Sequence, residues 1–190
     1  LLGWTVTDQR LRSRLEFLHR LEPESWPAFD DRSLLQELEG WLAPALGNTR
    51  RRADLAQIDV GAALLGRLDW RRQREVDRLA PTHIEVPSGS RIPVDYEPES
   101  GPVLAVRLQE MFGLTETPSV AGGRTPLVIH LLSPAHRPVQ VTSDLASFWA
   151  DGYADVRREL RGRYPKHPWP DDPLQAVATR HTKRRLAGEN

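Results

Sequence analysis

The chain has 190 residues, no cysteine and a formal net charge of zero, with 26 basic and 26 acidic side chains. A chain of this length forms one domain or two small ones, and the absence of cysteine excludes disulfides and thiolate metal sites. No apolar run approaches the roughly 18–20 residues that a membrane span needs, so we expect no membrane partner.

Two further features of the whole chain set expectations about its origin and partners. The chain begins LLGW without a methionine, so we expect a fragment of a longer protein, and the absence of cysteine fits a reducing cytoplasm. Of the 26 cations 24 are arginine, and the last 34 residues hold nine bases against four acids. Arginine suits forked contacts with phosphate, although a biased genome composition explains such an excess equally well.

The first 81 residues follow helical patterns. Leu11, Leu15 and Leu18 have the spacing of one helix face and predict a helix that Pro23 ends. Ser33 and Gln36 have capping-box spacing and predict the start of a second helix, which residues 44–47 end.

Two more helices complete the expected helical subdomain of residues 1–81. Residues 54–68 are rich in alanine and leucine, with interruptions at Gly61 and Gly66. Apolar spacing from Trp70 to Leu79 predicts a further helix, which Pro81 ends.

After residue 81 the pattern changes to a mixture of strands and helices. Residues 83–86 and 91–96 alternate around the turn sequence PSGS and predict a hairpin. Residues 102–112 carry apolar side chains at helical spacing, with Gly113 placed as the residue after the helix. The apolar run TPLVIHLL (125–132) predicts a buried strand, paired with residues 139–142.

A long helix is expected next, capped by Ser143 or Asp144 and weakened at Gly152. The predicted fold class is therefore α+β: a helical subdomain, then a small mixed α/β domain over residues 82–173 with hairpin strands and a long C-terminal helix. Residues 174–190 are expected to form a basic, disordered tail.

The sequence predicts no catalytic centre, metal site or cofactor site in these 190 residues. The phosphate-binding sequence G-x-x-x-x-G-K-[ST] is absent, and the histidines are not spaced as metal-ligand pairs. The loop Gly122-Gly123-Arg124 gives a weak phosphate-binding signal and is better read as a tight turn.

The strongest binding signal is the proline-rich ribbon RGRYPKHPWPDDP (161–173) with the helix end before it. Cations beside aromatic rings suit single-stranded nucleic acid, because cations meet phosphates and rings stack on bases. The candidate nucleic-acid-binding residues are Arg157, Arg158, Arg161, Arg163, Tyr164, Lys166, His167 and Trp169, with Arg124 as a further candidate.

The structural alternative is that the aromatic residues of the ribbon fasten it to its own domain. Tyr164 and Trp169 would then be packing residues, and the arginines would cover acids such as Glu159 or Asp171. The sequence leaves both interpretations open.

Four ordered blocks carry a family resemblance: VPSGSRIPVDY (86–96), PVLAVRLQEMFG (102–113), AGGRTPLVIHLLSPAHRPVQVTSDLASFWADGY (121–153) and VRRELRGRYPKHPWPDDP (156–173). They resemble the C-terminal domain of the bacterial HrpB family of DEAH-box ATP-dependent helicases. The upstream LRSRLEFLHR and SLLQELEGWL resemble the helical segment that precedes this domain.

The resemblance implies a parent enzyme with two RecA-like motor domains, ATP and Mg²⁺ as its cofactors, RNA as its partner and a cytoplasmic location. It gives no motor motif to any residue of this chain. Two hypotheses follow. In one, the chain is an accessory module that contacts single-stranded RNA or another nucleic acid, and in the other it is a structural or protein-docking domain that packs on the helicase core or recruits a partner protein.

Overall fold

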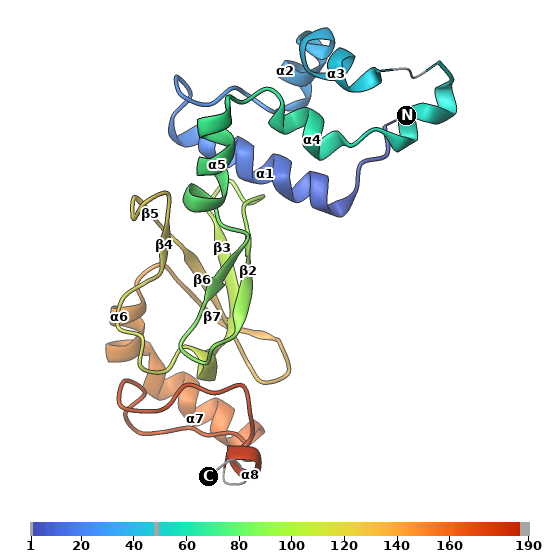
Figure 1. Cartoon of the computed structure of the whole chain (residues 1–190). Helices are drawn as coiled ribbons and strands as arrows, with labels where there is room; N and C mark the ends of the chain where they lie inside the picture. Colours follow the sequence, from blue (N-terminus) through green and yellow to red (C-terminus); the bar gives the residue numbers. More distant parts are fainter. Residues whose placement is uncertain (1, 48–49, 187–190) are drawn as a thin grey trace. The chain divides into compact units, whose positions relative to one another are not determined.

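A computed structural model describes residues 2–47 and 50–186 of the chain, which divides into two compact units, Leu1–Pro81 and Thr82–Asn190 (Figure 1). We call these the N-terminal and the C-terminal unit and describe each by itself. Among the described residues, no helix has the length and apolarity to cross a membrane.

The N-terminal unit is helical, as the sequence predicted. Its elements are α1 (Val6–Leu21), α2 (Asp31–Gln36), α3 (Leu38–Leu46), a 3₁₀ helix (Arg52–Gln57), α4 (Val60–Leu65) and α5 (Trp70–Leu79). The first helix begins at a capping box in which Thr5 and Asp8 bond to each other's backbone N–H groups. Arg14, buried on α1, donates to the Ala80 carbonyl at 2.6 Å and to Asp77, which fastens α1 to α5.

Three local predictions in this unit were wrong in detail. Asp30, not Ser33, caps α2, because its carboxylate accepts the N–H groups of Arg32 and Ser33. The expected second helix is two helices, α2 and α3. Pro44 does not end α3, which continues to Leu46 although Pro44 cannot donate a backbone hydrogen bond. Residues 54–68 also break in two, because the Asp59 side chain caps α4.

The C-terminal unit is built on a five-stranded mixed sheet, which confirms the predicted α+β class. The strands are β1 (His83–Glu85), β2 (Arg91–Asp95), β3 (Val103–Arg107), β6 (Val128–Leu132) and β7 (Pro138–Thr142), in the order β1-β2-β3-β6-β7. Both predicted antiparallel pairs are present, with Ile84 opposite Ile92 and Ile129 opposite Thr142. Strands β4 (Ser119–Val120) and β5 (Thr125–Pro126) form a separate antiparallel pair.

The predicted helix over residues 102–112 was wrong. This segment forms the central strand β3 followed by a short 3₁₀ helix (Leu108–Glu110). Parallel pairing with β6 aligns Leu104 with Ile129 and buries both side chains completely. Burial in a central parallel strand favours a near-continuous apolar run, so pairing overrode the helical spacing.

The predicted C-terminal helix is present but contains a wider turn. Asp144 accepts the N–H of Ser147 at 3.0 Å and caps α6 (Leu145–Ser147), which passes through a π-helical segment (Phe148–Gly152) into α7 (Tyr153–Arg163). The rings of this helix meet Phe112 in the core, with a centroid distance of 6.2 Å from Phe112 to Tyr153.

Residues 174–186, which the sequence placed in a disordered tail, are anchored to the C-terminal unit. The Gln109 side-chain amide donates to the carbonyls of Thr179 and His181 at 3.0 and 3.2 Å, and the Gln109 backbone carbonyl accepts the Thr179 N–H. A short helix, α8 (Lys183–Leu186), follows. Composition could not reveal this anchor, because its bonds go to backbone atoms, and residues 187–190 of the expected tail lie outside the described residues.

Candidate nucleic-acid interface

The candidate site starts at the last two turns of α7. Leu160 is fully buried and holds the helix against its unit, so Arg158, Arg161 and Arg163 are exposed, whereas Arg157 is half-buried. The helix ends at Tyr164, whose N–H donates to the Leu160 carbonyl at 2.7 Å. Arg161 and Lys166, on either side of this end, are exposed and form no ion pair within the described part of the chain.

The ribbon is fastened to its own unit by a ladder of hydrogen bonds. The Trp169 indole N–H donates to the Tyr164 carbonyl at 2.8 Å, and Arg157 Nε donates to the Trp169 carbonyl at 3.0 Å. The Tyr153 hydroxyl donates to the Pro170 carbonyl at 2.8 Å. Because prolines cannot donate backbone bonds, the ribbon is held through its carbonyl groups.

Trp169 therefore cannot stack on a base in this conformation. Its side chain is 6% exposed and its only polar atom is already bonded within the ribbon. The structural alternative from the sequence holds for this residue: Trp169 pins the ribbon to the domain. Tyr164 is half-buried and its ring meets that of His167 edge-on at 6.5 Å.

Several of the predicted arginines are paired with acids. Arg157 forms an ion pair with Asp171, as the structural alternative required. Arg163 lies 3.3 Å from Glu159, but both side chains are 59% exposed, so water competes for this contact. Arg158 pairs with Asp155 at 3.0 Å, again in full contact with solvent.

The remaining two candidates differ in exposure: His167 is half-buried, and Arg124 is exposed. For His167, burial together with the charge of Arg107 lowers the pKa, which favours the neutral ring. Arg124 lies in the loop between β4 and β5, where Nε donates to the Ala121 carbonyl at 2.8 Å. The loop is a tight turn with positive φ at Ala121, Gly122 and Gly123, as the sequence favoured.

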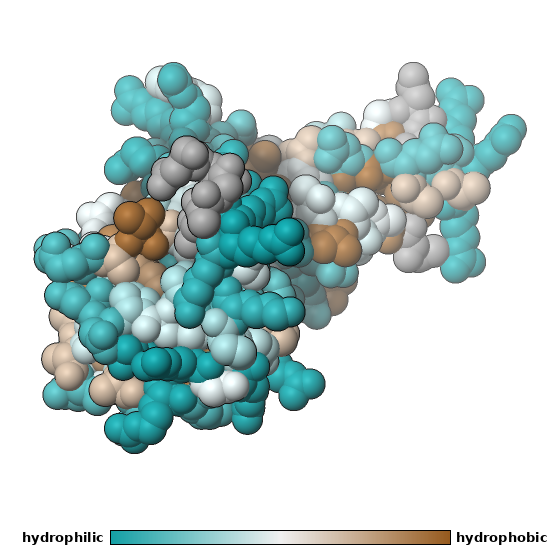
Figure 2. All heavy atoms as spheres, turned by 90° about the horizontal axis from the view of Figure 1, so that it is seen from below, coloured by the Kyte–Doolittle hydropathy of each residue, from teal (hydrophilic) through white to brown (hydrophobic). Residues whose placement is uncertain are grey.

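Helix α8 adds cations that sequence reasoning missed. The Lys183 N–H donates to the Lys166 carbonyl at 2.9 Å and its ammonium donates to the Pro165 carbonyl at 3.2 Å, so α8 lies against the ribbon. Seen from the end where α7 and α8 lie, the C-terminal unit presents mainly hydrophilic side chains (Figure 2). We define the basic face as the exposed residues Arg161, Arg163, Lys166, Lys183 and Arg184. The sequence signal was the tripeptide Lys183-Arg184-Arg185, which was assigned to a tail.

A buried acidic network supports the β1–β2 turn of the same unit. Glu110 is 2% exposed and accepts hydrogen bonds from Ser88 Oγ and Arg107 Nε, both at 2.8 Å. Burial by itself raises the pKa of Glu110, but the hydrogen bonds from Ser90, Ser88 and Arg107 outweigh burial and lower the pKa overall. The carboxylate is therefore a structural anion.

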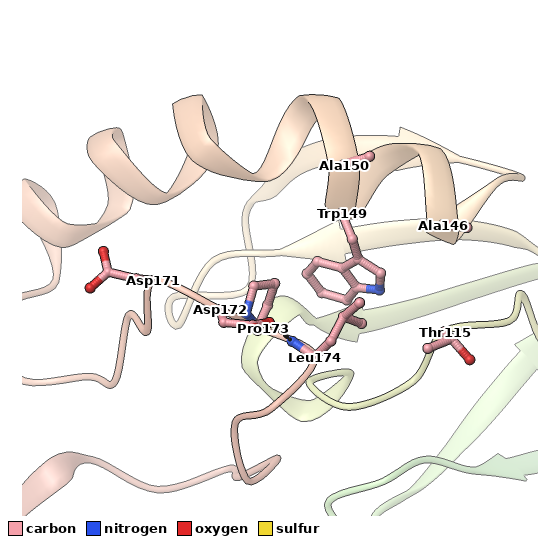
Figure 3. Close-up of a pocket in the computed structure, with 8 residues that line it drawn as sticks. All are labelled: Thr115, Ala146, Trp149, Ala150, Asp171, Asp172, Pro173 and Leu174. Carbon is pink, nitrogen blue, oxygen red and sulfur yellow. Dashed lines mark hydrogen bonds between the residues drawn. The ribbon is translucent and has the colours of Figure 1, made fainter.

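A groove of about 410 Å³ lies between the π-helical segment and the end of the ribbon. Figure 3 shows the Trp149 ring reaching from its helix toward Pro173 and Leu174. Asp171 and Asp172 line one side. In the described part of the chain, no three His, Asp or Glu side chains are placed to hold a metal ion.

Comparison with known proteins decides the family. The family model for the C-terminal region of ATP-dependent helicases, HrpB_C, matches residues 41–173. The chain belongs to the HrpB helicase family. The ATP-dependent RNA helicase HrpB of Escherichia coli K12 is 48% identical over 184 residues, which are 96% of this chain and 23% of that protein. This HrpB chain therefore spans about a quarter of the length of its curated relative.

Solved structures agree with this assignment. The crystal structure of the E. coli DExH-box NTPase HrpB matches with a TM-score of 0.87 and 48% identity, over 95% of this chain and 22% of that one. The crystal structure of the Escherichia coli DEAH/RHA helicase HrpB matches with a TM-score of 0.73 and 46% identity, over 88% and 21%. The fold described above is that of the C-terminal region of HrpB helicases.

Proposed function

We propose that the chain is a non-catalytic accessory module of an HrpB helicase and that its basic face contacts the phosphates of single-stranded RNA. The observation that carries this proposal is the basic face itself. Arg161, Lys166 and Lys183 are exposed at one end of the C-terminal unit, although the chain as a whole has no net charge.

The proposed contact is with phosphates because the ribbon offers little ring surface for stacking. Trp169 is buried and Tyr164 is half-buried, so the charged side chains are the more accessible groups. The ribbon holds the end of α7 and the first residue of α8 together, since Lys183 bonds to the carbonyls of Pro165 and Lys166. A rigid scaffold lowers the entropic cost of ordering long cationic side chains on a ligand.

The parent helicase supplies the rest of the proposed setting. The chain contains no phosphate-binding loop, so ATP and Mg²⁺ belong to motor domains outside it. The curated relative is named an ATP-dependent RNA helicase, which supports RNA as the nucleic acid. We also propose a cytoplasmic location for the parent helicase.

A second function, docking on the helicase core or on another protein, is favoured by the groove at Trp149. Leu174 lines the groove and is 37% exposed, and Val177, three residues further along the chain, is 83% exposed. Exposed apolar side chains beside a groove are typical of protein-binding surfaces.

The test is fluorescence anisotropy of this chain with a labelled 12-nucleotide single-stranded RNA over a range of salt concentrations. Each phosphate contact contributes about 0.7 to the slope of log K against log salt, so five cations give a slope of about −3.5. Affinity should then fall about 100-fold when salt rises from about 50 to about 200 mM.

The decisive variant reverses three charges of the basic face: Arg161→Glu, Lys166→Glu and Lys183→Glu. Its matched control reverses three exposed arginines of the N-terminal unit: Arg10→Glu, Arg32→Glu and Arg50→Glu. We expect the slope of log K against log salt to be smaller in magnitude by at least about 2 in the first variant and to be unchanged in the control. Equal losses in both variants, or no binding at low salt, would refute the phosphate contact and favour docking.

A further inference from the structure

Trp70, at the start of α5, differs from the other tryptophans of the chain in its exposure. It is 62% exposed, whereas Trp26, Trp41, Trp149 and Trp169 are each between 3% and 7% exposed and Trp4 is half-buried. Tryptophan is a highly buried residue on average, because its ring carries a large apolar area. The Trp70 ring therefore leaves most of its apolar area open to solvent.

The packing of α5 explains why Trp70 faces water. The helix is held by Val76 and Leu79, which are 2% and 6% exposed. Residue 72 lies one turn before Val76 and two turns before Leu79. The helix face that is buried therefore passes through residue 72 and not through Trp70. The apolar spacing of the sequence predicted Trp70 in the buried stripe of this helix, and the structure shows that it lies outside the stripe.

Two arginines without acidic partners lie beside the exposed ring. The guanidinium carbon of Arg71 is 5.4 Å from the centre of the Trp70 ring. Arg74 follows one helical turn after Trp70 and is exposed. Neither arginine forms an ion pair with any described residue.

The acids of this helix are already engaged by other arginines. Asp69 lies 3.6 Å from Arg72, and Glu75 lies 3.1 Å from Arg78. Asp77 pairs with Arg14. The positive charge beside Trp70 is therefore not neutralised within the helix.

We infer that Trp70, Arg71 and Arg74 form a stacking site for a base of single-stranded nucleic acid. The indole stacks on one unpaired base, and the two guanidinium groups contact the neighbouring phosphates. A duplex does not fit this chemistry, because its bases are already stacked on one another. This inference rests on the proposed function for its class of ligand, but it uses residues of the N-terminal unit alone.

The surroundings of Trp70 favour nucleic acid over a protein partner. A protein-docking surface is typically a contiguous apolar patch. On α5, Trp70 is the one large apolar side chain that is exposed, and Arg71, Gln73 and Arg74 around it are polar. An isolated aromatic ring among cations is the arrangement that single-strand binding proteins use.

The experiment measures binding of a labelled 12-nucleotide single-stranded RNA to the Trp70→Phe and Trp70→Leu variants at constant salt. Trp70→Leu keeps apolar area but removes the ring, so we expect it to bind about 5- to 150-fold more weakly with an unchanged salt slope. Trp70→Phe should retain most of the affinity. The double variant Arg71→Gln and Arg74→Gln removes two proposed phosphate contacts. Its slope of log K against log salt should be smaller in magnitude by about 1.4.

The matched control is Leu35→Ala, which removes another exposed apolar side chain of the same unit, 70% exposed. A second readout is photo-crosslinking of RNA that contains 5-iodouridine, with the cross-linked peptide identified by mass spectrometry. Cross-linking to the peptide that contains Trp70 supports the stacking site.

The outcomes separate this inference from the proposed function. If Trp70→Leu binds like the wild type while the reversed basic face loses RNA, the stacking site is refuted and the proposed function stands. If Trp70→Leu weakens binding and the reversed basic face does not, the stacking site stands and the basic face is refuted. Equal weakening by Leu35→Ala, or no RNA binding by the wild type, overturns the stacking site.

Discussion

Truncation of Trp169 tests whether the ribbon is a packed part of the C-terminal unit. The side chain is 6% exposed, and its indole N–H donates to the Tyr164 carbonyl at 2.8 Å. Removal of a buried tryptophan side chain costs about 3–5 kcal/mol, against a total stability of about 5–15 kcal/mol for a typical domain. We expect Trp169→Ala to lower the melting temperature of this unit by about 12–20 °C.

Trp169→Phe separates ring packing from the hydrogen bond. Phenylalanine keeps most of the buried area but leaves the Tyr164 carbonyl without its donor, which costs about 1–3 kcal/mol. We expect this variant to be less stable than the wild type and more stable than Trp169→Ala. Because the buried ring is not proposed to touch RNA, the affinity of folded Trp169→Phe should stay within a factor of about 3.

The assays are thermal unfolding and urea unfolding, both followed by far-ultraviolet circular dichroism, because a tryptophan variant changes the fluorescence signal itself. The control is Trp70→Ala, which removes the same side chain from a position that is 62% exposed. That change should alter stability by less than about 0.5 kcal/mol. A cost below about 1 kcal/mol for Trp169→Ala would refute the view that the ribbon is part of the core.

Three further perturbations follow from the structure. Glu110 has a lowered pKa in the folded state, so its contribution to stability is full above its ordinary value of 4.5 and is lost as pH falls through the folded value. Glu110→Gln should remove that part of the acid dependence, measured as melting temperature between about pH 3 and pH 7. Gly152→Ala should destabilise the C-terminal helix, because the new methyl carbon would lie 2.9 Å from the Phe148 ring. Gly162→Ala meets nothing within 4 Å and should instead stabilise the same helix by about 0.5–1 kcal/mol, as urea unfolding would show. Gln109→Ala should release the C-terminal segment that it anchors, seen as at least about tenfold faster amide exchange there.

Each of these has an outcome that contradicts it. An unchanged acid limb in Glu110→Gln would mean that the carboxylate is not a stabilising anion. A Gly152→Ala variant as stable as Gly162→Ala would contradict the close approach of the Phe148 ring. Exchange that does not change in Gln109→Ala would show that the segment is held by other contacts.

Local sequence determined most of the elements that depend on short-range physics. The leucine spacing of α1, the hairpin around PSGS and the capped helix from Asp144 were all predicted, because each is set by side chains within a few residues of one another. The family was also legible, because four ordered blocks cover much of the chain.

Tertiary pairing decided what local periodicity could not. Residues 103–107 carry apolar side chains compatible with either a helix or a strand, and pairing with the neighbouring strands β2 and β6 selects the strand. The segment 174–186 looked like a solvated tail by composition, yet bonds from the buried Gln109 and from Lys183 hold it to the rest of its unit.

The candidate site shows the same division between composition and packing. The sequence showed that cations and aromatic rings gather after residue 157, but not which of them face water. The structure turns Trp169 inward, pairs Arg157 with Asp171, and leaves Trp70 exposed on a helix where periodicity had placed it in the core. Exposure is decided by which neighbours a side chain meets after the chain has folded, and a one-dimensional sequence does not contain those neighbours.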